Sequence, residues 1–207
     1  MQKSGNKIYF CGNMSRISYN HLNLPHTISG TGGTISNVYD AAGRKWQSTQ
    51  AGVTTTYFGD IEYEGNAIKA IYHADGRILN NAGSYEYQYY IKDHLGNVRI
   101  VCNSAAVIQS EQHYYPFGLN MEGNFTATVY NQKYRYNGKE LYGGLGWYDY
   151  GARYYDPSVG RFTGVDPLAE MMPGYSPYAY TFNNPMIHTD PTGMKPERKT
   201  VFDLHAE

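Results

Sequence analysis

The stretch that decides the fold is Tyr72–Val101, which reads YHADGRILNNAGSYEYQYYIKDHLGNVRIV. It contains two copies of one phrase, in which a tyrosine is followed by polar residues, a glycine turn and a basic residue. An aspartate stands shortly before the glycine in each copy, as Asp75 before Gly76 and Asp93 before Gly96, so each pair can supply an Asx turn and a left-handed residue. The segments around the turns are rich in β-branched and aromatic residues, which favour strands. The stretch therefore predicts antiparallel β-hairpins.

The same phrase occurs earlier in the chain, at intervals that suit one strand-turn-strand unit each. The lead tyrosines of the copies are Tyr19, Tyr39, Tyr57, Tyr72 and Tyr90. From about residue 104 the period fades, and Gly, Pro, Asn and Tyr become denser. Because Gly and Pro disfavour helix, we expect only one short helical turn there, around Pro167 to Met172. The predicted organisation is repeats over 1–103, a second region over 104–194, and a tail or stub over 195–207.

The composition excludes several classes of protein. Tyr and Gly occur 23 times each, whereas Leu, which usually heads the list, is scarce, so a helical protein is disfavoured. A net charge of −1 with 17% charged residues gives no basic footprint, and nucleic acid is not an expected partner. No apolar run approaches the roughly 20 residues that cross a bilayer, and the first residues hold no signal-peptide core. We therefore expect neither a membrane span nor a signal peptide in this chain.

Metal and cofactor chemistry is also not expected. Cys11 and Cys102 are too few for a disulfide framework, and neither belongs to a CxxC pair. The seven histidines show no spacing that would place two imidazoles on one metal ion. The sequence thus predicts no cofactor and no metal.

The phrases in this chain resemble those of the Rhs (YD-repeat) family of bacterial polymorphic toxins. The resemblance rests on an ordered run that reads DHLGNVR, YYPFGL, YNGKEL, WYDYGARYYDP, GRF, VDPLAE, SPYAYTFNNP and DPTG. By this likeness, residues 19–101 are similar to degenerate YD repeats and residues 90–194 to the Rhs repeat-associated core domain. The resemblance implies an all-β fold, in which an antiparallel sheet of YD-repeat hairpins forms part of a β-shell or cage. A Gly/Pro/Tyr-rich core domain with little helix then closes one end.

The resemblance also implies a function and partners. A shell of this kind encloses and delivers a C-terminal toxin, at the cell surface or after secretion, in competition between bacteria. The implied partners are the rest of the YD-repeat shell and that toxin, for which residues 195–207 leave no room. Because a sheet of few repeats has an unpaired edge strand, we also expect the chain to self-associate. An alternative is a cell-surface adhesin whose tyrosines stack on carbohydrate, which a glycan array would distinguish from a shell.

In parts of this family the core domain is an aspartyl autoprotease that cuts the chain just after a DPxGL sequence. Two Asp-Pro steps lie in the matching places here, at Asp166 and Asp190. A pair of carboxylates can share one proton, so that one acts as a base and the other as an acid. The resemblance places the bond to be cut between Met194 and Lys195.

Two further observations bear on this candidate site. Arg161 lies five residues before Asp166 and could pair with it, which would lower the pKa of the carboxyl and disfavour the sharing of a proton. The chain also differs from the family pattern, with Ala169 in place of a glycine and Met194 in place of a leucine. The alternative for both Asp-Pro steps is structural, because Asp caps turns and Pro fixes φ. Autocleavage and turn formation are therefore both open at this point.

Overall fold

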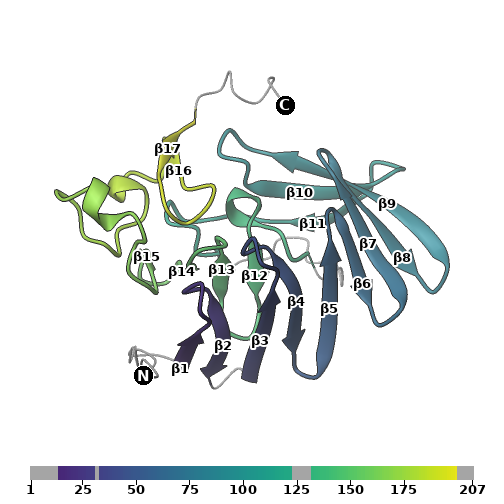
Figure 1. Ribbon diagram of the computed structural model, residues 1–207. Helices are drawn as coiled ribbons and strands as arrows, with labels where there is room; N and C mark the ends of the chain where they lie inside the picture. Colours follow the sequence, from purple (N-terminus) through teal and green to yellow (C-terminus); the bar gives the residue numbers. More distant parts are fainter. Residues whose placement is uncertain (1–13, 31–32, 123–131, 200–207) are drawn as a thin grey trace. The chain divides into compact units, whose positions relative to one another are not determined.

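The computed structural model describes residues 14–30, 33–122 and 132–199 of the chain. In these residues the regular structure is almost entirely β-strand, which confirms the predicted all-β fold (Figure 1). The chain divides into two compact units, Met1–Glu86 with Gly143–Leu145 and Tyr87–Tyr142 with Gly146–Glu207. The boundary falls inside one strand, so each unit is described separately. No helix in the described ranges is long and apolar enough to cross a membrane.

The largest sheet has eleven strands in the described residues, and they are hydrogen-bonded in chain order. Neighbouring strands such as β1 and β2 or β9 and β10 run antiparallel, as expected of successive hairpins. The strands are β1 Met14–Tyr19, β2 Pro25–Gly30, β3 Gly33–Tyr39, β4 Lys45–Gln50, β5 Val53–Phe58, β6 Ile61–Glu64, β7 Ala67–His73, β8 Gly76–Asn81, β9 Ser84–Lys92, β10 Val98–Asn103 and β11 Ile108–Glu111. Strands β1 to β8 belong to the first unit, and the second unit begins within β9.

The repeated phrase builds the turn between β3 and β4 through one aspartate. Asp40 Oδ1 accepts the backbone N–H groups of Ala42 and Arg44, both at 2.9 Å, and Asp40 Oδ2 pairs with Arg44 Nε at 2.8 Å. Gly43 completes the turn with φ of +80°. The preceding tyrosine, Tyr39, donates its hydroxyl to Pro25 O at 2.9 Å and so ties the hairpin to the previous one. The tyrosine, the aspartate, the glycine and the basic residue of the phrase therefore each stabilise this hairpin.

Two turns differ from the sequence prediction. Gly76 was expected to be a left-handed turn residue, but it pairs with His73 and opens β8, so that prediction is wrong. A two-residue loop already closes this hairpin, and the glycine therefore lies in the ladder. Conversely, Asn103 builds a turn that no repeated phrase indicated, and its Oδ1 accepts the N–H groups of Ala105 and Val107 at 3.0 Å. An asparagine here replaces the aspartate of the other copies.

The second unit contains two further small sheets. The first has four strands in chain order, β12 Glu140–Tyr142, β13 Trp147–Asp149, β14 Tyr154–Asp156 and β15 Arg161–Phe162, and the second pairs β16 His188–Thr189 with β17 Glu197–Arg198. The described residues also contain short 3₁₀ helices, η1 Tyr136–Gly138, η2 Ala169–Met171 and η3 Thr181–Asn183. Helix η2 lies within the range where the sequence predicted a helical turn, whereas η1 and η3 were not predicted.

Aromatic rings form the core of the second unit. The buried cluster consists of Tyr136, Tyr148, Tyr150, Tyr155, Phe162 and Tyr180. The rings of Tyr155 and Tyr180 pack with their centroids 4.2 Å apart. Burial raises the pKa of Tyr150 and Tyr180 well above the usual value, so these hydroxyls stay neutral. A core of this kind requires a hydrogen-bond partner for every buried hydroxyl.

The YYPFGL loop supplies those partners for three of the tyrosines. The hydroxyls donate to three consecutive backbone carbonyls, from Tyr136 to Pro116 at 2.8 Å, from Tyr155 to Phe117 at 2.7 Å and from Tyr148 to Gly118 at 3.2 Å. The loop therefore closes over the ring cluster and satisfies both its own carbonyls and the tyrosine hydroxyls.

We expect Gly118→Ala to lower the free energy of unfolding of the second unit by about 2 to 4 kcal/mol. Gly118 has φ of +84°, and a Cβ there would lie 2.5 Å from the Tyr136 ring, which cannot move without opening the core. The matched control is Gly96→Ala, because Gly96 has φ of +77° but nothing within 4 Å of its Cβ position. That control should lose only about 1 kcal/mol. Urea denaturation followed by near-UV circular dichroism measures both, and equal losses would contradict the packing argument.

Candidate functional site

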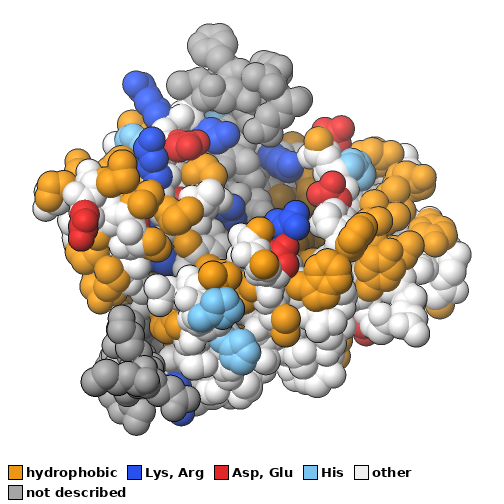
Figure 2. Space-filling view, viewed as in Figure 1, with side chains coloured by type: hydrophobic (Ala, Val, Ile, Leu, Met, Phe, Trp, Pro, Cys, Tyr) orange, Lys and Arg blue, Asp and Glu red, His pale blue; other side chains and the backbone are white. Residues whose placement is uncertain are grey.

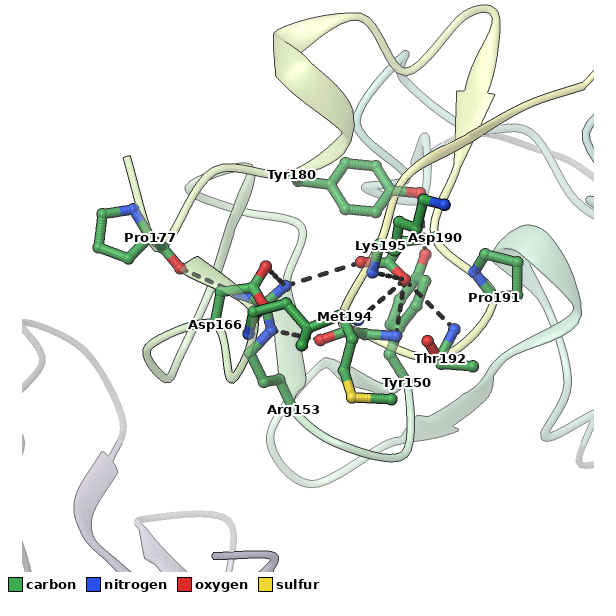
Figure 3. Close-up of polar contacts among 12 residues, drawn as sticks. Tyr150, Arg153, Asp166, Pro177, Tyr180, Asp190, Pro191, Thr192, Met194 and Lys195 are labelled. Atoms are coloured by element: carbon green, nitrogen blue, oxygen red, sulfur yellow. Dashed lines mark hydrogen bonds and ion pairs between the residues drawn. The ribbon is translucent and has the colours of Figure 1, made fainter. Parts of the chain in front are cut away.

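The segment between β16 and β17 is a turn organised by one carboxylate. Asp190 Oδ1 accepts the backbone N–H groups of the residues that follow it, which are Thr192 at 3.2 Å, Gly193 at 2.8 Å, Met194 at 3.1 Å and Lys195 at 3.3 Å (Figure 3). The expected turn chemistry of the Asp-Pro step is therefore present. One oxygen of the carboxylate fixes the backbone on both sides of the Met194–Lys195 bond.

Gly193 allows this turn to lie close to the core. Its φ is +74°, and a Cβ would come within 3.1 Å of Tyr150 Cβ and 3.2 Å of Tyr150 O. Lys139 holds the turn from another direction, because its Nζ donates to Pro191 O at 2.6 Å and lies 5.3 Å from the centre of the Tyr150 ring. Burial lowers the pKa of Lys139, against the opposing effect of Asp149 and Asp190. The turn is thus held by the core residue Tyr150 and by a lysine from the YNGKEL phrase.

Arg153 is the charged centre of the site, and the sequence analysis did not identify it. It directly precedes β14 and is only 3% exposed. Its Nη2 donates to Asp166 Oδ2 at 2.8 Å, its Nε to Gly193 O at 2.5 Å, and its Nη1 to Pro177 O at 2.9 Å. The guanidinium also stacks 3.7 Å from the centre of the Phe162 ring. One side chain thus joins β14, the VDPLAE segment and the DPTG turn.

The two aspartates lie on either side of this guanidinium (Figure 3). Asp166 makes the close ion pair, and its other oxygen, Oδ1, accepts the N–H of Leu168 at 2.7 Å. Asp190 Oδ2 is 3.7 Å from Arg153 Nη2 and has no hydrogen-bond partner, although the residue is fully buried. Burial raises the pKa of Asp190, and this effect exceeds the lowering by Arg153 and by the backbone N–H groups. The two carboxylates are therefore unequal, with one ion-paired and one able to hold a proton.

The structure brings together four of the five residues that the sequence singled out. Asp166, Asp190, Met194 and Lys195 all lie around Arg153 or the DPTG turn. Arg161 does not, because it is exposed on β15 with its Nη1 3.5 Å from Ser176 Oγ. The guanidinium beside Asp166 is that of Arg153, which corrects the expected pairing. No local signal in the sequence points to Arg153, because its partners Asp166 and Gly193 lie 13 and 40 residues further along the chain.

A shallow pocket lies beside Asp166. Its lining includes Ala169, Met172, Tyr175, Phe182 and Pro196 together with Asp166. Among residues 14–30, 33–122 and 132–199, no group of three or more His, Cys, Asp or Glu side chains is placed to hold a metal ion. The chemistry available at this site is that of two carboxylates, one guanidinium and a peptide bond.

Several known proteins share sequence with this chain, although no protein-family model matches it. Salivary gland surface protein 1 of Aedes aegypti is 31% identical over 62% of this chain. The tRNA3(Ser)-specific nuclease WapA of Bacillus spizizenii is 27% identical over 75% of the chain, and toxin subunit YenC2 of Yersinia entomophaga is 39% identical over 44%. The chain corresponds to 4%, 7% and 9% of the lengths of these proteins, respectively.

A solved structure shares the fold. The crystal structure of TcdB2-TccC3 without its hypervariable C-terminal region matches 88% of this chain with a TM-score of 0.72 and 23% sequence identity. The matched part is 10% of that longer chain. At this identity the likeness establishes the fold alone.

Proposed function

We propose that this chain is part of a shell of the Rhs (YD-repeat) family, which encloses and delivers a toxic effector. Strands β1 to β11 would be a section of wall, and the tyrosine-cored part of the second unit, which follows β11 in the chain, would be the closing core. The site around Arg153 would cut the chain between Met194 and Lys195 and so free the downstream segment. The likeness to toxin subunits and to a nuclease supports the first part, and the geometry of the DPTG turn supports the second. A secreted or cell-surface location follows from the same proposal.

One observation carries the proposed cleavage. The nitrogen of the Met194–Lys195 peptide bond belongs to Lys195, and it lies 3.3 Å from the carboxylate of Asp190. Since the pKa of Asp190 is raised, this carboxyl can hold a proton next to the atom that must receive one when the bond breaks. A capping aspartate whose pKa is not raised could fix the turn but would hold a proton less readily.

Each residue of the site has one role in the proposed reaction. Asp166, paired with Arg153, accepts a proton from a water molecule that enters from the pocket and attacks the carbonyl carbon of Met194. The carbonyl becomes tetrahedral, so the nitrogen of Lys195 becomes basic and takes the proton of Asp190. The C–N bond then breaks, which leaves a carboxyl group on Met194 and an amine on Lys195. Arg153 holds the two carboxylates apart and fixes the carbonyl of Gly193.

The direct experiment is to incubate the 207-residue chain at neutral pH and to determine its mass and the amino terminus of any product under denaturing conditions. A product that begins at Lys195 supports the proposal. An intact chain after prolonged incubation, with native circular dichroism, would contradict it.

Cleavage should slow as the pH rises through the raised pKa of Asp190. The protonated carboxyl is the active form, and it is present below that pKa and absent above it. The rate of appearance of the Lys195 product, measured over a range of pH that begins above the ordinary pKa of an aspartate, checks this. A rate that rises throughout this range would show that Asp190 is not the acid.

A second candidate function is adhesion to carbohydrate, as part of a cell-surface protein. It is favoured by a row of hydrophobic side chains on β9, where Tyr87, Tyr89 and Ile91 are 48%, 41% and 54% exposed. Figure 2 shows hydrophobic side chains gathered over this region of the surface. Binding of the chain to a glycan array would favour this candidate, whereas a shell wall should not bind the glycans.

A further inference from the structure

One face of the sheet in the first unit carries apolar side chains that line up across four strands. Phe58 on β5 is opposite Ile61 on β6. Ile71 on β7 is opposite both Ile61 and Ile78 on β8. Residues that are directly opposite in an antiparallel pair lie on the same face of the sheet. The four side chains therefore form one line across β5 to β8.

Trp46 extends this line to a fifth strand, β4. Its ring packs edge to face against that of Phe58, with the ring centroids 6.1 Å apart and the ring planes at 86°. Trp46 is 43% exposed and Phe58 is 61% exposed, whereas the three isoleucines are half-buried. Exposed aromatic rings of this size are the side chains that contribute most to protein interfaces. Trp46, Phe58, Ile61, Ile71 and Ile78 are called the apolar row below.

The opposite face of the same strands is buried. Glu62 on β6 and Ala70 on β7 are opposite each other, and both are almost inaccessible to solvent. Side chains alternate between the two faces along a strand, so Glu62 and Ala70 point away from the apolar row. The sheet therefore has one covered face and one face on which the apolar row is open to solvent. A contiguous exposed apolar patch of this kind marks an interaction surface.

Charged side chains of opposite sign lie at the two ends of the apolar row. Arg44 is in the turn between β3 and β4, two residues before Trp46, and its side chain is 83% exposed although Nε pairs with Asp40. Asp75 is exposed in the turn between β7 and β8, three residues before Ile78. Alternate turns of an antiparallel sheet lie at the same edge, so these two turns share one edge. The row thus has a cation beside its β4 end and an anion beside its β8 end.

We propose that the apolar row is a dimer interface, on which the apolar row of a second copy of this chain packs face to face. A two-fold axis parallel to the strands and centred on β6 places the β4 end of one row over the β8 end of the other. Trp46 and Phe58 then pack on Ile78 and its neighbours in the second copy. Arg44 meets Asp75 of the second copy, and symmetry repeats this pair. An axis perpendicular to the strands would separate these charges, so charge complementarity selects the parallel axis.

The size of the face indicates a reversible dimer. Five strands that are about 4.8 Å apart and about 20 Å long present a projected area of about 400 to 500 Å². A standard stable interface buries about 800 Å² on each partner. Asp60, which is exposed in the turn between β5 and β6, also lies near the axis and faces its own copy. We therefore expect a dissociation constant on the order of tens of micromolar.

Sedimentation velocity of the 207-residue chain, from about 1 to 200 μM, tests the dimer. The sedimentation coefficient should rise with concentration, and Phe58→Ser should raise the dissociation constant at least about tenfold. Val53→Ser is the matched control, because Val53 is 48% exposed at the other end of β5, and it should leave the constant unchanged. The dimer does not depend on cleavage, since every residue of the row belongs to the first unit. A chain that stays monomeric would overturn the proposal, and so would association through strand edges that is as strong in Phe58→Ser as in the parent chain.

A charge exchange tests the orientation of the two copies. Arg44→Glu and Asp75→Arg should each raise the dissociation constant about five- to tenfold, because each places like charges opposite one another. The turn survives Arg44→Glu, since Asp40 Oδ1 still accepts the backbone N–H groups of residues 42 and 44. The double variant should return to within about twofold of the parent chain. A double variant that dimerises no better than the single variants would overturn the proposed two-fold arrangement.

Discussion

Replacing Arg153 with methionine is expected to lower the free energy of unfolding of the second unit by about 3 to 5 kcal/mol and to abolish cleavage. The guanidinium is 3% exposed and donates to Asp166 Oδ2, Gly193 O and Pro177 O. Methionine can replace the contact with the Phe162 ring, but it leaves two carbonyls without a donor and two carboxylates without a counter-charge. Breaking a buried ion pair from one side is strongly destabilising because the remaining charge stays buried.

Arg161→Met is the matched control for this prediction. Arg161 is exposed, and the contact of its guanidinium with Ser176 Oγ is long, at 3.5 Å. We expect that variant to change the free energy of unfolding by less than about 0.5 kcal/mol and to leave the cleavage rate intact. Arg153→Lys separates charge from geometry, because one ammonium group cannot reach three acceptors in different directions. Urea denaturation gives the stabilities. Equal losses at Arg153 and Arg161 would mean that the buried ion pair does not stabilise the unit.

The hairpin sheet could be predicted because its signals are local. Asp40 caps its own turn within four residues, and Asp93 does the same with the N–H groups of Leu95 and Asn97. A phrase that forms its turn from its own side chains can be recognised in the sequence alone. Gly76 was assigned to the turn, but the sequence His73–Gly76 also fits a two-residue loop that ends before the glycine. The pairing of Gly76 with His73 shows that the second alternative is correct.

The site could be predicted only in part, because its members meet through the tertiary fold. Asp190 and Lys195 are close in sequence, so the turn that joins them follows from the Asp-Pro-x-Gly pattern. Arg153 reaches Asp166 across 13 residues and Gly193 across 40, and no local pattern reports such a contact. Arg161 was nearer to Asp166 along the chain, but it lies on an exposed strand position. Asp166 therefore pairs with the buried Arg153 and not with Arg161, which is nearer along the chain.

The tyrosine core illustrates the same limit. Tyrosine hydroxyls buried in a core need polar partners, and three of them find these partners in the backbone of one loop. The carbonyls of Pro116, Phe117 and Gly118 each accept one tyrosine hydroxyl. Composition indicates that such hydroxyls need acceptors, but the identity of the acceptors depends on how the YYPFGL loop folds over the rings.

Asp190→Asn is expected to reduce the rate of cleavage by about 10² to 10⁴ while leaving the fold intact. The amide oxygen can still accept the N–H groups of Thr192, Gly193, Met194 and Lys195, so the turn is preserved. What is lost is the carboxyl group, whose pKa is raised by burial and which donates the proton in the proposed reaction. Asp166→Asn should reduce the rate by a similar factor, since it removes the base, and should also destabilise the unit because Arg153 loses its close ion pair. Product beginning at Lys195, quantified by denaturing mass spectrometry over time, gives the rates.

A third Asp-Pro step provides the control for both variants. Asp156 precedes Pro157, and its Oδ1 accepts the N–H of Ser158 at 2.9 Å, as a capping aspartate does. It makes the same kind of turn as Asp190 without a buried arginine beside it, so Asp156→Asn should leave the cleavage rate unchanged. Acid alone can also break Asp-Pro bonds, but that reaction would cut after Asp156, Asp166 and Asp190 and would not produce a terminus at Lys195. If the product at Lys195 persists in Asp166→Asn and Asp190→Asn, the carboxylates are turn formers only, and the Arg153 cluster is structural.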